Sequence, residues 1–198
     1  MVPSEATAIR YEFNFPFCGK TGMTSKEMCL LLGATGVGKT LLLKRLQKFI
    51  VHGLDELGTP PSTLPTVGTN LTDLTVKKKK VTVRELGGCM GPIWPSYFKD
   101  CSSVIFMVDS ANIAQISSSC IQLLSVLSAE PLSKASVLIL FNKRDMPCTM
   151  SLIEIKSLFR MDDIVASATQ PITTLEVSAR SGEGLKEVMS WLESVTVK

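Results

Sequence analysis

The chain has 198 residues, of which 45% are apolar and 20% are charged, and its formal net charge is +3 at pH 7. These values suit one domain with its own core and exclude a chain that is disordered throughout. No apolar run approaches the roughly 18 residues of a membrane-spanning helix. Four of the positive charges sit together at residues 77–80, so we expect no distributed nucleic-acid-binding face.

The six cysteines form no CxxC pair, and His52 is the single histidine. This spacing fits neither a zinc site nor a disulfide framework. We therefore expect reduced thiols and a cytoplasmic protein.

Residues 1–26 are predicted to form a flexible extension, and residues 27–198 a single domain. Termini are usually loose unless something ties them down. Between Tyr11 and Phe17, however, aromatic residues alternate with polar or small ones, a pattern that an added edge strand also shows. Because Val2 stands where a myristate would need glycine, we expect no stable membrane anchor and at most transient membrane association.

Short apolar runs and helical periodicity alternate along the domain. Strands are predicted at 28–32, 71–76, 81–86, 104–108, 137–141 and 174–177, and helices at 42–50, 116–127, 152–159 and 185–194. Strands separated by helices predict an α/β fold with a mostly parallel six-stranded sheet and helices on both faces. The strands at 71–76 and 81–86 flank the lysine run, which we interpret as the solvated tip of a hairpin.

A glycine-rich phosphate-binding loop of the pattern GxxxxGK[ST] lies between the first strand and the first helix. Its residues are Gly33, Ala34, Thr35, Gly36, Val37, Gly38, Lys39 and Thr40. The glycines let successive backbone N–H groups turn toward phosphate oxygens, and the helix N-terminus adds partial positive charge. Lys39 is expected against the β- and γ-phosphates, and the Thr40 hydroxyl on Mg²⁺.

An NKxD motif, with Asn142, Lys143 and Asp145, directly follows the strand at 137–141. A carboxylate there can accept hydrogen bonds from N1–H and the 2-amino group of guanine, whereas adenine has no 2-amino group. Asn142 is expected to brace the loop, and the Lys143 stem to cover one face of the base.

A third motif follows the last predicted strand and consists of Ser178, Ala179 and Arg180. The Ala179 N–H is expected to reach O6 of guanine. The phosphate-binding loop, the NKxD motif and this tripeptide, in that order, predict GTP or GDP as the ligand.

These three motifs resemble those of the small GTPases. The segments 91–98 and 104–110 resemble the corresponding segments of the ADP-ribosylation factor-like branch of that family. The resemblance covers about residues 27–198. The resemblance implies a P-loop NTPase fold and a switch that binds GTP or GDP with Mg²⁺ and recruits effector proteins through its switch regions. An exchange factor and a GTPase-activating protein are further implied partners.

The resemblance also implies the two switch segments. Residues 65–68 would be switch I, with Thr66 sensing Mg²⁺ and the γ-phosphate. Residues 85–88 would be switch II, with Glu85 toward Mg²⁺ and the Gly88 N–H reaching the γ-phosphate.

The sequence departs from the family pattern at two positions of switch II. Glu85 stands in place of an aspartate. Because its side chain is one methylene longer, its carboxylate must meet the water that links it to Mg²⁺ at a different angle. Cys89 stands in place of the glutamine that orients the attacking water, and a thiol is a short, weak partner for water. Lys39 and Cys89 are the candidate catalytic residues, and with a defective Cys89 we expect slow intrinsic GTP hydrolysis.

Several alternatives stay open at this point. A GTP-binding scaffold with negligible turnover fits the same motifs, and a phosphate-loop kinase or ATPase is a further reading that Asp145 disfavours. The loop at 52–65 is longer than the family usually shows and either holds switch I open, adds a partner surface or is a longer solvated loop. Trp94 and Tyr97 either face effectors or pack in the core.

Overall fold

The computed structural model describes residues 28–54 and 56–196, so the prediction for residues 1–26 lies outside the described residues. Its strands are β1 (Met28–Gly33), β2 (Thr69–Val76), β3 (Lys79–Leu86), β4 (Ser103–Asp109), β5 (Ser136–Asn142) and β6 (Ile172–Glu176). Its α-helices are α1 (Lys39–His52), α2 (Ile113–Leu127), α3 (Leu152–Phe159), α4 (Met161–Ser167) and α5 (Leu185–Val195). Two 3-10 helices, η1 (Gly88–Asp100) and η2 (Glu130–Leu132), complete the chain.

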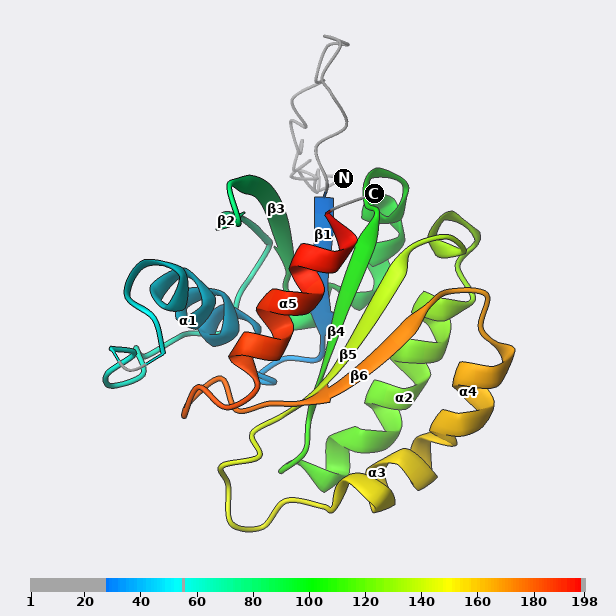
Figure 1. The fold of residues 1–198 in the computed structure, drawn as a ribbon. Coiled ribbons are helices and arrows are strands. Elements are labelled where there is room, and N and C mark those ends of the chain that lie inside the picture. The colour runs from blue at the N-terminus through cyan, green and yellow to red at the C-terminus, as the bar shows by residue number, and fades with distance from the viewer. Residues whose placement is uncertain (1–27, 55, 197–198) are drawn as a thin grey trace, which may run out of the picture.

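The strands form one six-stranded sheet in the order β2-β3-β1-β4-β5-β6 (Figure 1). Strand β2 is antiparallel to β3, and every other pair is parallel. The predicted mostly parallel α/β sheet is therefore confirmed. Parallel strands end at the same edge of a sheet, so the loops that follow β1, β4 and β5 lie next to one another.

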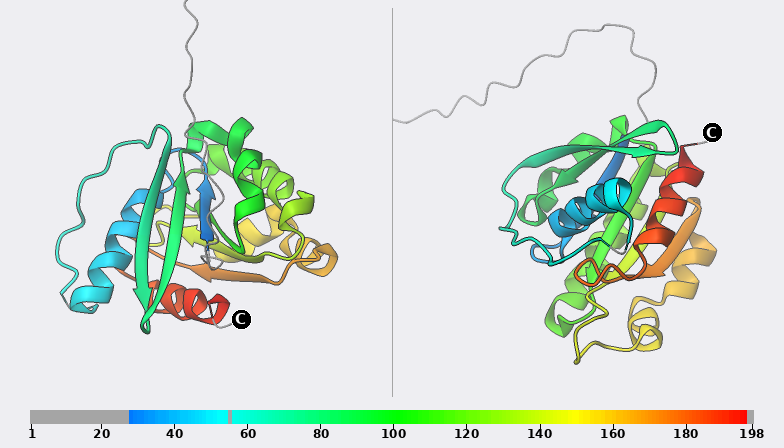
Figure 2. Two further views of the ribbon diagram at one scale, coloured as in Figure 1. Left: turned by 90° about the horizontal axis from the view of Figure 1, so that it is seen from above. Right: turned by 60° about the vertical axis from the view of Figure 1, so that its left-hand side comes forward.

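Helices cover both faces of the sheet, as predicted (Figures 1 and 2). Successive side chains of a strand point to opposite faces, so Leu31 packs with α1 and α5 while Leu30 and Leu32 pack with η1, α2 and α3. The central strands β4 and β5 are almost wholly buried. Their continuous apolar runs at 104–108 and 137–141 are typical of strands covered on both faces.

Three elements escape the sequence analysis, namely η1, η2 and α4, and η2 has only three residues. Helix η1 contains Pro92 and Pro95, which interrupt the hydrogen bonds of a regular helix and its periodicity. Helix α4 has only seven residues and begins directly after Arg160, whose φ of 50° ends α3. A segment this short is below the length at which helical periodicity is informative.

The lysine run lies at the end of the β2–β3 hairpin, and all four lysines are exposed, as expected. The turn consists of Lys77 and Lys78, both with positive φ, while the next two lysines belong to β3. Lys77 pairs with Glu193 of α5, and the Lys79 ammonium donates to the carbonyl oxygen of Thr196 at 2.7 Å. These contacts hold the end of the hairpin against the end of α5, and sequence spacing alone does not reveal them.

The alternatives for Trp94 and Tyr97 are resolved differently for the two residues. Trp94 is 3% exposed, packs edge-on against Phe106 with ring centroids 6.5 Å apart, and donates its indole N–H to the Gly87 carbonyl oxygen. Tyr97 is half-buried, and the Arg84 guanidinium lies 5.2 Å from its ring centre. Trp94 is thus a core residue, whereas Tyr97 packs against the edge of the same core and stays partly exposed.

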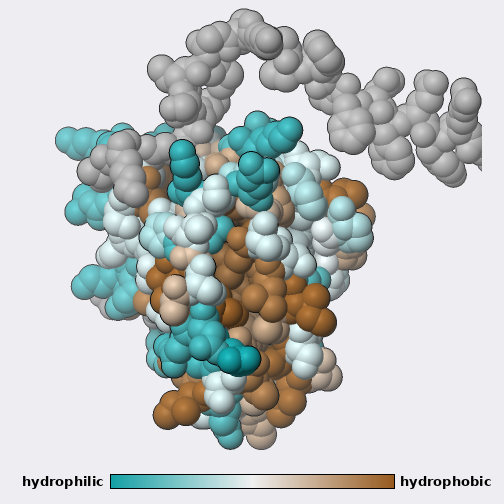
Figure 3. Space-filling model, turned by 90° about the vertical axis from the view of Figure 1, so that its right-hand side faces the viewer, coloured by the Kyte–Doolittle hydropathy of each residue, from teal (hydrophilic) through white to brown (hydrophobic). Residues whose placement is uncertain are grey.

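Exposed apolar side chains gather on the side of the molecule that α2, α3 and α4 form (Figure 3). They are Ile113, Ile121, Leu124, Ile153, Leu158 and Val165. Among the described residues, none of the helices combines the length and the apolar character that crossing a membrane requires.

The burial of Trp94 predicts a large loss of stability when it is truncated. We expect Trp94→Ala to lower the free energy of unfolding by about 3–5 kcal/mol, because the change leaves a cavity and a carbonyl without its donor. Tyr97→Ala is the comparison, with a smaller loss of about 1–2 kcal/mol, because the Tyr97 ring is only partly buried against the core. Urea unfolding followed by circular dichroism measures both, with any bound ligand held at one concentration. Equal, small losses would contradict the core position of Trp94.

Candidate functional site

The phosphate-binding loop, residues 33–40, borders a cavity of about 230 Å³. Gly36 and Gly38 have φ of 81° and 102°, a conformation that residues with a side chain rarely adopt. The cavity is lined by Thr35, Gly36, Gly38, Lys39, Thr40, Thr63, Leu64, Pro65, Thr66, Glu85 and Gly88. The fold thus brings the loop together with both predicted switch segments.

Lys39 is nearly buried beneath the loop. Its ammonium donates to the carbonyl oxygens of Gly33 at 2.7 Å and Ala34 at 2.9 Å, which keeps the side chain along the loop. Burial lowers the Lys39 pKa to about 8, because desolvation disfavours the charged form, and the nearby Glu85 works in the opposite direction. An anion bound in the cavity would favour the charged form of Lys39.

Three oxygen-bearing side chains meet at one point of the cavity. The Thr40 hydroxyl lies 2.9 Å from the Thr66 hydroxyl and donates to Glu85 Oε1 at 2.5 Å, and Thr66 donates to the same carboxylate oxygen at 3.1 Å. Hydroxyl and carboxylate oxygens are the hard ligands that Mg²⁺ prefers, and phosphate oxygens commonly complete its shell. The donor set therefore fits Mg²⁺, which would replace hydrogen bonds that these groups now make with one another.

The predicted switch II segment approaches both the phosphate-binding loop and the predicted switch I segment so closely that only glycine fits. A Cβ at Gly88 would lie 2.2 Å from the backbone nitrogen of Thr35, and one at Gly87 would lie 2.5 Å from the carbonyl oxygen of Thr66. Gly87 also donates its N–H to Gly68 O at 2.9 Å. Both switch segments are closed onto the loop in this structure.

The residues predicted to read the base meet at the ends of β5 and β6. Asn142 is buried, donates through Nδ2 to Val37 O at 2.7 Å and accepts the Ala179 N–H at Oδ1 at 3.0 Å. Ser178 is buried and donates to Asp145 Oδ1 at 2.6 Å, which orients that exposed carboxylate. The Ala179 N–H is therefore already engaged, and O6 of a guanine would share it in a three-centre hydrogen bond.

Lys143 has a positive φ of 69°, and its ammonium pairs with Asp109 Oδ2 at 2.6 Å. The same Asp109 carboxylate accepts the Ala111 N–H at 3.0 Å. Asp109 thus both caps its own loop and anchors the lysine stem that we expect beside the base. Strand register explains the contact, because Asp109 and Asn142 are partners in β4 and β5.

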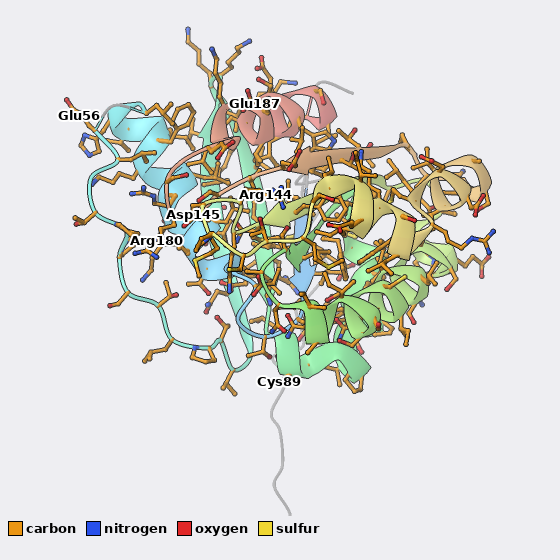
Figure 4. The ribbon with its side chains drawn as sticks, turned by 90° about the horizontal axis from the view of Figure 1, so that it is seen from below. Glu56, Cys89, Arg144, Asp145, Arg180 and Glu187 are labelled. Carbon is orange, nitrogen blue, oxygen red and sulfur yellow. The ribbon has the colours of Figure 1, made fainter. Side chains whose placement is uncertain are left out.

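Figure 4 looks onto this edge of the sheet. Asp145 and Arg180, from the loops after β5 and β6, are seen together on one side, and Cys89 of η1 on the other. The Cys89 side chain is exposed and is not among the residues that line the cavity, but its neighbour Gly88 abuts Thr35 of the phosphate-binding loop. The Arg180 side chain is also exposed.

A buried arginine on α1 is the main residue of this region that the sequence analysis missed. The Arg45 guanidinium contacts the loop that contains Ala179 and Arg180. Helical spacing placed Arg45 on the polar side of its helix, and no local pattern distinguishes it from a solvated cation.

The sequence matches the model of the ADP-ribosylation factor family over residues 17–196. ADP-ribosylation factor-like protein 16 of Homo sapiens is 61% identical over 174 residues, which cover 87% of this chain and 88% of the relative. ADP-ribosylation factor-like protein 1 of Drosophila melanogaster is 35% identical over 173 residues, which cover 86% of this chain and 89% of the relative.

Among solved structures, the Arl6 BBS3 small GTPase from Trypanosoma brucei with bound nucleotide analogue GppNp matches with a TM-score of 0.72. The match has 20% sequence identity and covers 86% of this chain and 97% of that one. At this identity the likeness concerns the fold, and it confirms the predicted P-loop NTPase fold of the small GTPases. Together with the family match and the sequence identities, it leads to one assignment: the chain belongs to the ADP-ribosylation factor family of small GTPases, which are GTP-binding switches.

Proposed function

We propose that this protein binds GTP or GDP with its phosphates on the loop at 33–40 and its guanine on Asp145. The observation that carries the proposal is the position of Asn142, which hydrogen-bonds both to Val37 in the phosphate-binding loop and to Ala179 beside the base-reading residues. One buried side chain thus joins the two ends of a site that a single nucleotide would span.

In the proposed switch, Thr66 and Gly88 respond to the γ-phosphate. Thr66 stands with Thr40 and Glu85 at the expected Mg²⁺ position, and Gly88 abuts the phosphate-binding loop at Thr35. When bound, Mg²⁺ would neutralise charge on the β- and γ-phosphates. Contacts with the γ-phosphate would add to those that hold both segments at the loop, so its loss would favour their opening.

We further propose that intrinsic hydrolysis is slow. Lys39 and Glu85 are the ionisable residues among those that line the cavity, and both already have partners, Lys39 with loop carbonyls and Glu85 with the two threonines. Neither is available to orient an attacking water. Cys89, at the position where the family resemblance implies a glutamine, is exposed and offers only a thiol.

Effector proteins are the partners that we propose for the switch segments, with an exchange factor and a GTPase-activating protein as regulators. Leu64 and Val67 flank Thr66 and are 86% and 89% exposed, so a partner that reads switch I would cover them.

The cytoplasm is the compartment that we propose. Burial raises the pKa of Cys29 and of Cys101 to about 12, so both thiols resist oxidation there.

The role of Asp145 predicts a change of base preference. Asp145→Asn exchanges an acceptor of two guanine hydrogen bonds for an amide, so the affinity for GDP should fall about a hundredfold or more, while the affinity for xanthosine diphosphate, whose 2-oxo group accepts from the amide, should rise. Isothermal titration with each nucleotide measures this. Asp162→Asn, an exposed aspartate in the first turn of α4, is the control and should keep the wild-type preference.

Wild-type protein that binds ADP as tightly as GDP would contradict the proposed ligand. An Asp145→Asn variant that still prefers GDP would contradict the proposed role of the carboxylate. The two results are distinguishable because the first needs no substitution.

The role of Cys89 predicts a gain of activity. Cys89→Gln supplies an amide that both donates to and accepts from water, so the single-turnover rate of GTP hydrolysis should rise about tenfold or more. Cys89→Ser keeps the size of the thiol without the amide and serves as the control at the same position, where we expect the wild-type rate.

An unchanged or slower rate in Cys89→Gln would count against slow hydrolysis being due to the thiol. The nucleotide that survives purification separates a switch from a scaffold. GTP retained by wild-type protein and GDP retained by Cys89→Gln would mark wild type as a scaffold with negligible turnover.

A further inference from the structure

Arg45 of α1 is a buried cation whose acceptors are all backbone carbonyls. Its side chain is 2% exposed. The guanidinium donates to Ala179 O at 3.1 Å, Arg180 O at 2.6 Å, Leu57 O at 2.8 Å and Gly58 O at 2.9 Å. Four hydrogen bonds from one charged group to two separate segments are a costly arrangement to break, because each carbonyl would lose a charged donor.

The four acceptors belong to two loops that are far apart in the sequence. One is the base-binding loop, residues 178–184, which follows β6. The other is the strap, which we define as residues 56–65 and which leads from the end of α1 to Thr66. A guanidinium is planar and presents its donors in a rigid fork, so one arginine can fix the distance between two backbones where a lysine cannot.

Leu57 provides a second, independent contact between the strap and the base-binding loop. Its side chain is 4% exposed, although most of the strap is exposed. A Cβ at Gly182 would lie 2.6 Å from Leu57 Cδ1, and the φ of Gly182 is +97°. The strap therefore docks on the base-binding loop through a buried leucine against a glycine as well as through Arg45.

The base-binding loop in turn positions the carboxylate that we propose reads guanine. Ser178 donates to Asp145 Oδ1 at 2.6 Å and accepts the Ser181 N–H at 3.0 Å. Gly182 donates its N–H to Ser178 O at 2.8 Å. A shift of residues 178–182 would therefore move the serine that orients Asp145.

We propose that Arg45 and Leu57 are positioning residues, which clamp the strap to the base-binding loop and thereby set the affinity and selectivity for guanine. The inference rests on the proposed function, since it concerns how Asp145 is held toward the base. It also assigns a role to the long segment before switch I, which supports the base-binding loop. Displacing the strap would loosen the grip on the base, while Lys39 would keep its own hydrogen bonds to the phosphate-binding loop.

The first test measures release of nucleotide. In the full-length chain with Mg²⁺, Arg45→Lys keeps the charge but loses the fork, and Leu57→Ala removes the buried side chain. We expect each to raise the dissociation rate of GDP about tenfold or more, measured by chasing a fluorescent GDP with an excess of unlabelled GDP. Lys44→Ala and Val51→Ala, exposed positions on the same helix, are the matched controls and should keep the wild-type rate.

The second test separates positioning from a general loss of stability. Inosine diphosphate lacks the 2-amino group that we expect Asp145 to read. Wild type should prefer GDP to inosine diphosphate, and both positioning variants should narrow that ratio, whereas simple destabilisation would weaken both nucleotides alike. Because both residues act on one loop, the double variant should change the ratio by less than the product of the single effects.

The outcomes distinguish this inference from the proposed function. A wild type without preference for GDP over ADP would overturn the proposed ligand itself. A wild type with that preference, beside variants whose release rates and nucleotide ratios stay within about twofold of it, would overturn the clamp. If Arg45→Lys does not fold, as judged by circular dichroism, Leu57→Ala decides the question.

Discussion

The arrangement of this site depends on the buried amide of Asn142. It donates to the phosphate-binding loop at Val37 and accepts from the base-binding loop at Ala179. The three segments follow β1, β5 and β6, and parallel pairing brings the ends of these strands to one edge of the sheet. A buried amide that makes both hydrogen bonds keeps this edge in one arrangement, because breaking either would leave a polar group unpaired inside the protein.

The polar side chains beside the phosphate-binding loop form hydrogen bonds with other groups of the protein. Lys39 is held by two carbonyls of its own loop, and Thr40, Thr66 and Glu85 share hydrogen bonds. These same groups are the ones proposed to meet phosphate and Mg²⁺, so ligand binding exchanges one set of partners for another rather than leaving buried groups without partners. The closed position of Gly88 against Thr35 belongs to the same arrangement.

Cys89 and the proposed clamp act on two different properties of the proposed switch. Cys89 concerns the attack of water, and the clamp of Arg45 and Leu57 concerns how firmly the base is held. A protein with slow hydrolysis and a supported base-binding loop keeps its nucleotide until a partner intervenes. In that case regulators, rather than intrinsic chemistry, set the lifetime of each state.

Local sequence determined the sheet strands, the phosphate-binding loop and the NKxD motif, because apolar runs and fixed spacings encode them within a few residues. It also indicated both switch segments through the family resemblance. The pairing of Lys143 with Asp109, the core position of Trp94, the attachment of Lys77 to Glu193 and the fork of Arg45 depended on tertiary structure. Arg45 meets a carbonyl 134 positions away, and no local pattern distinguishes such a cation from one in solvent. Only the folded chain decides which distant backbone a side chain meets, since strand order and loop packing bring the two together.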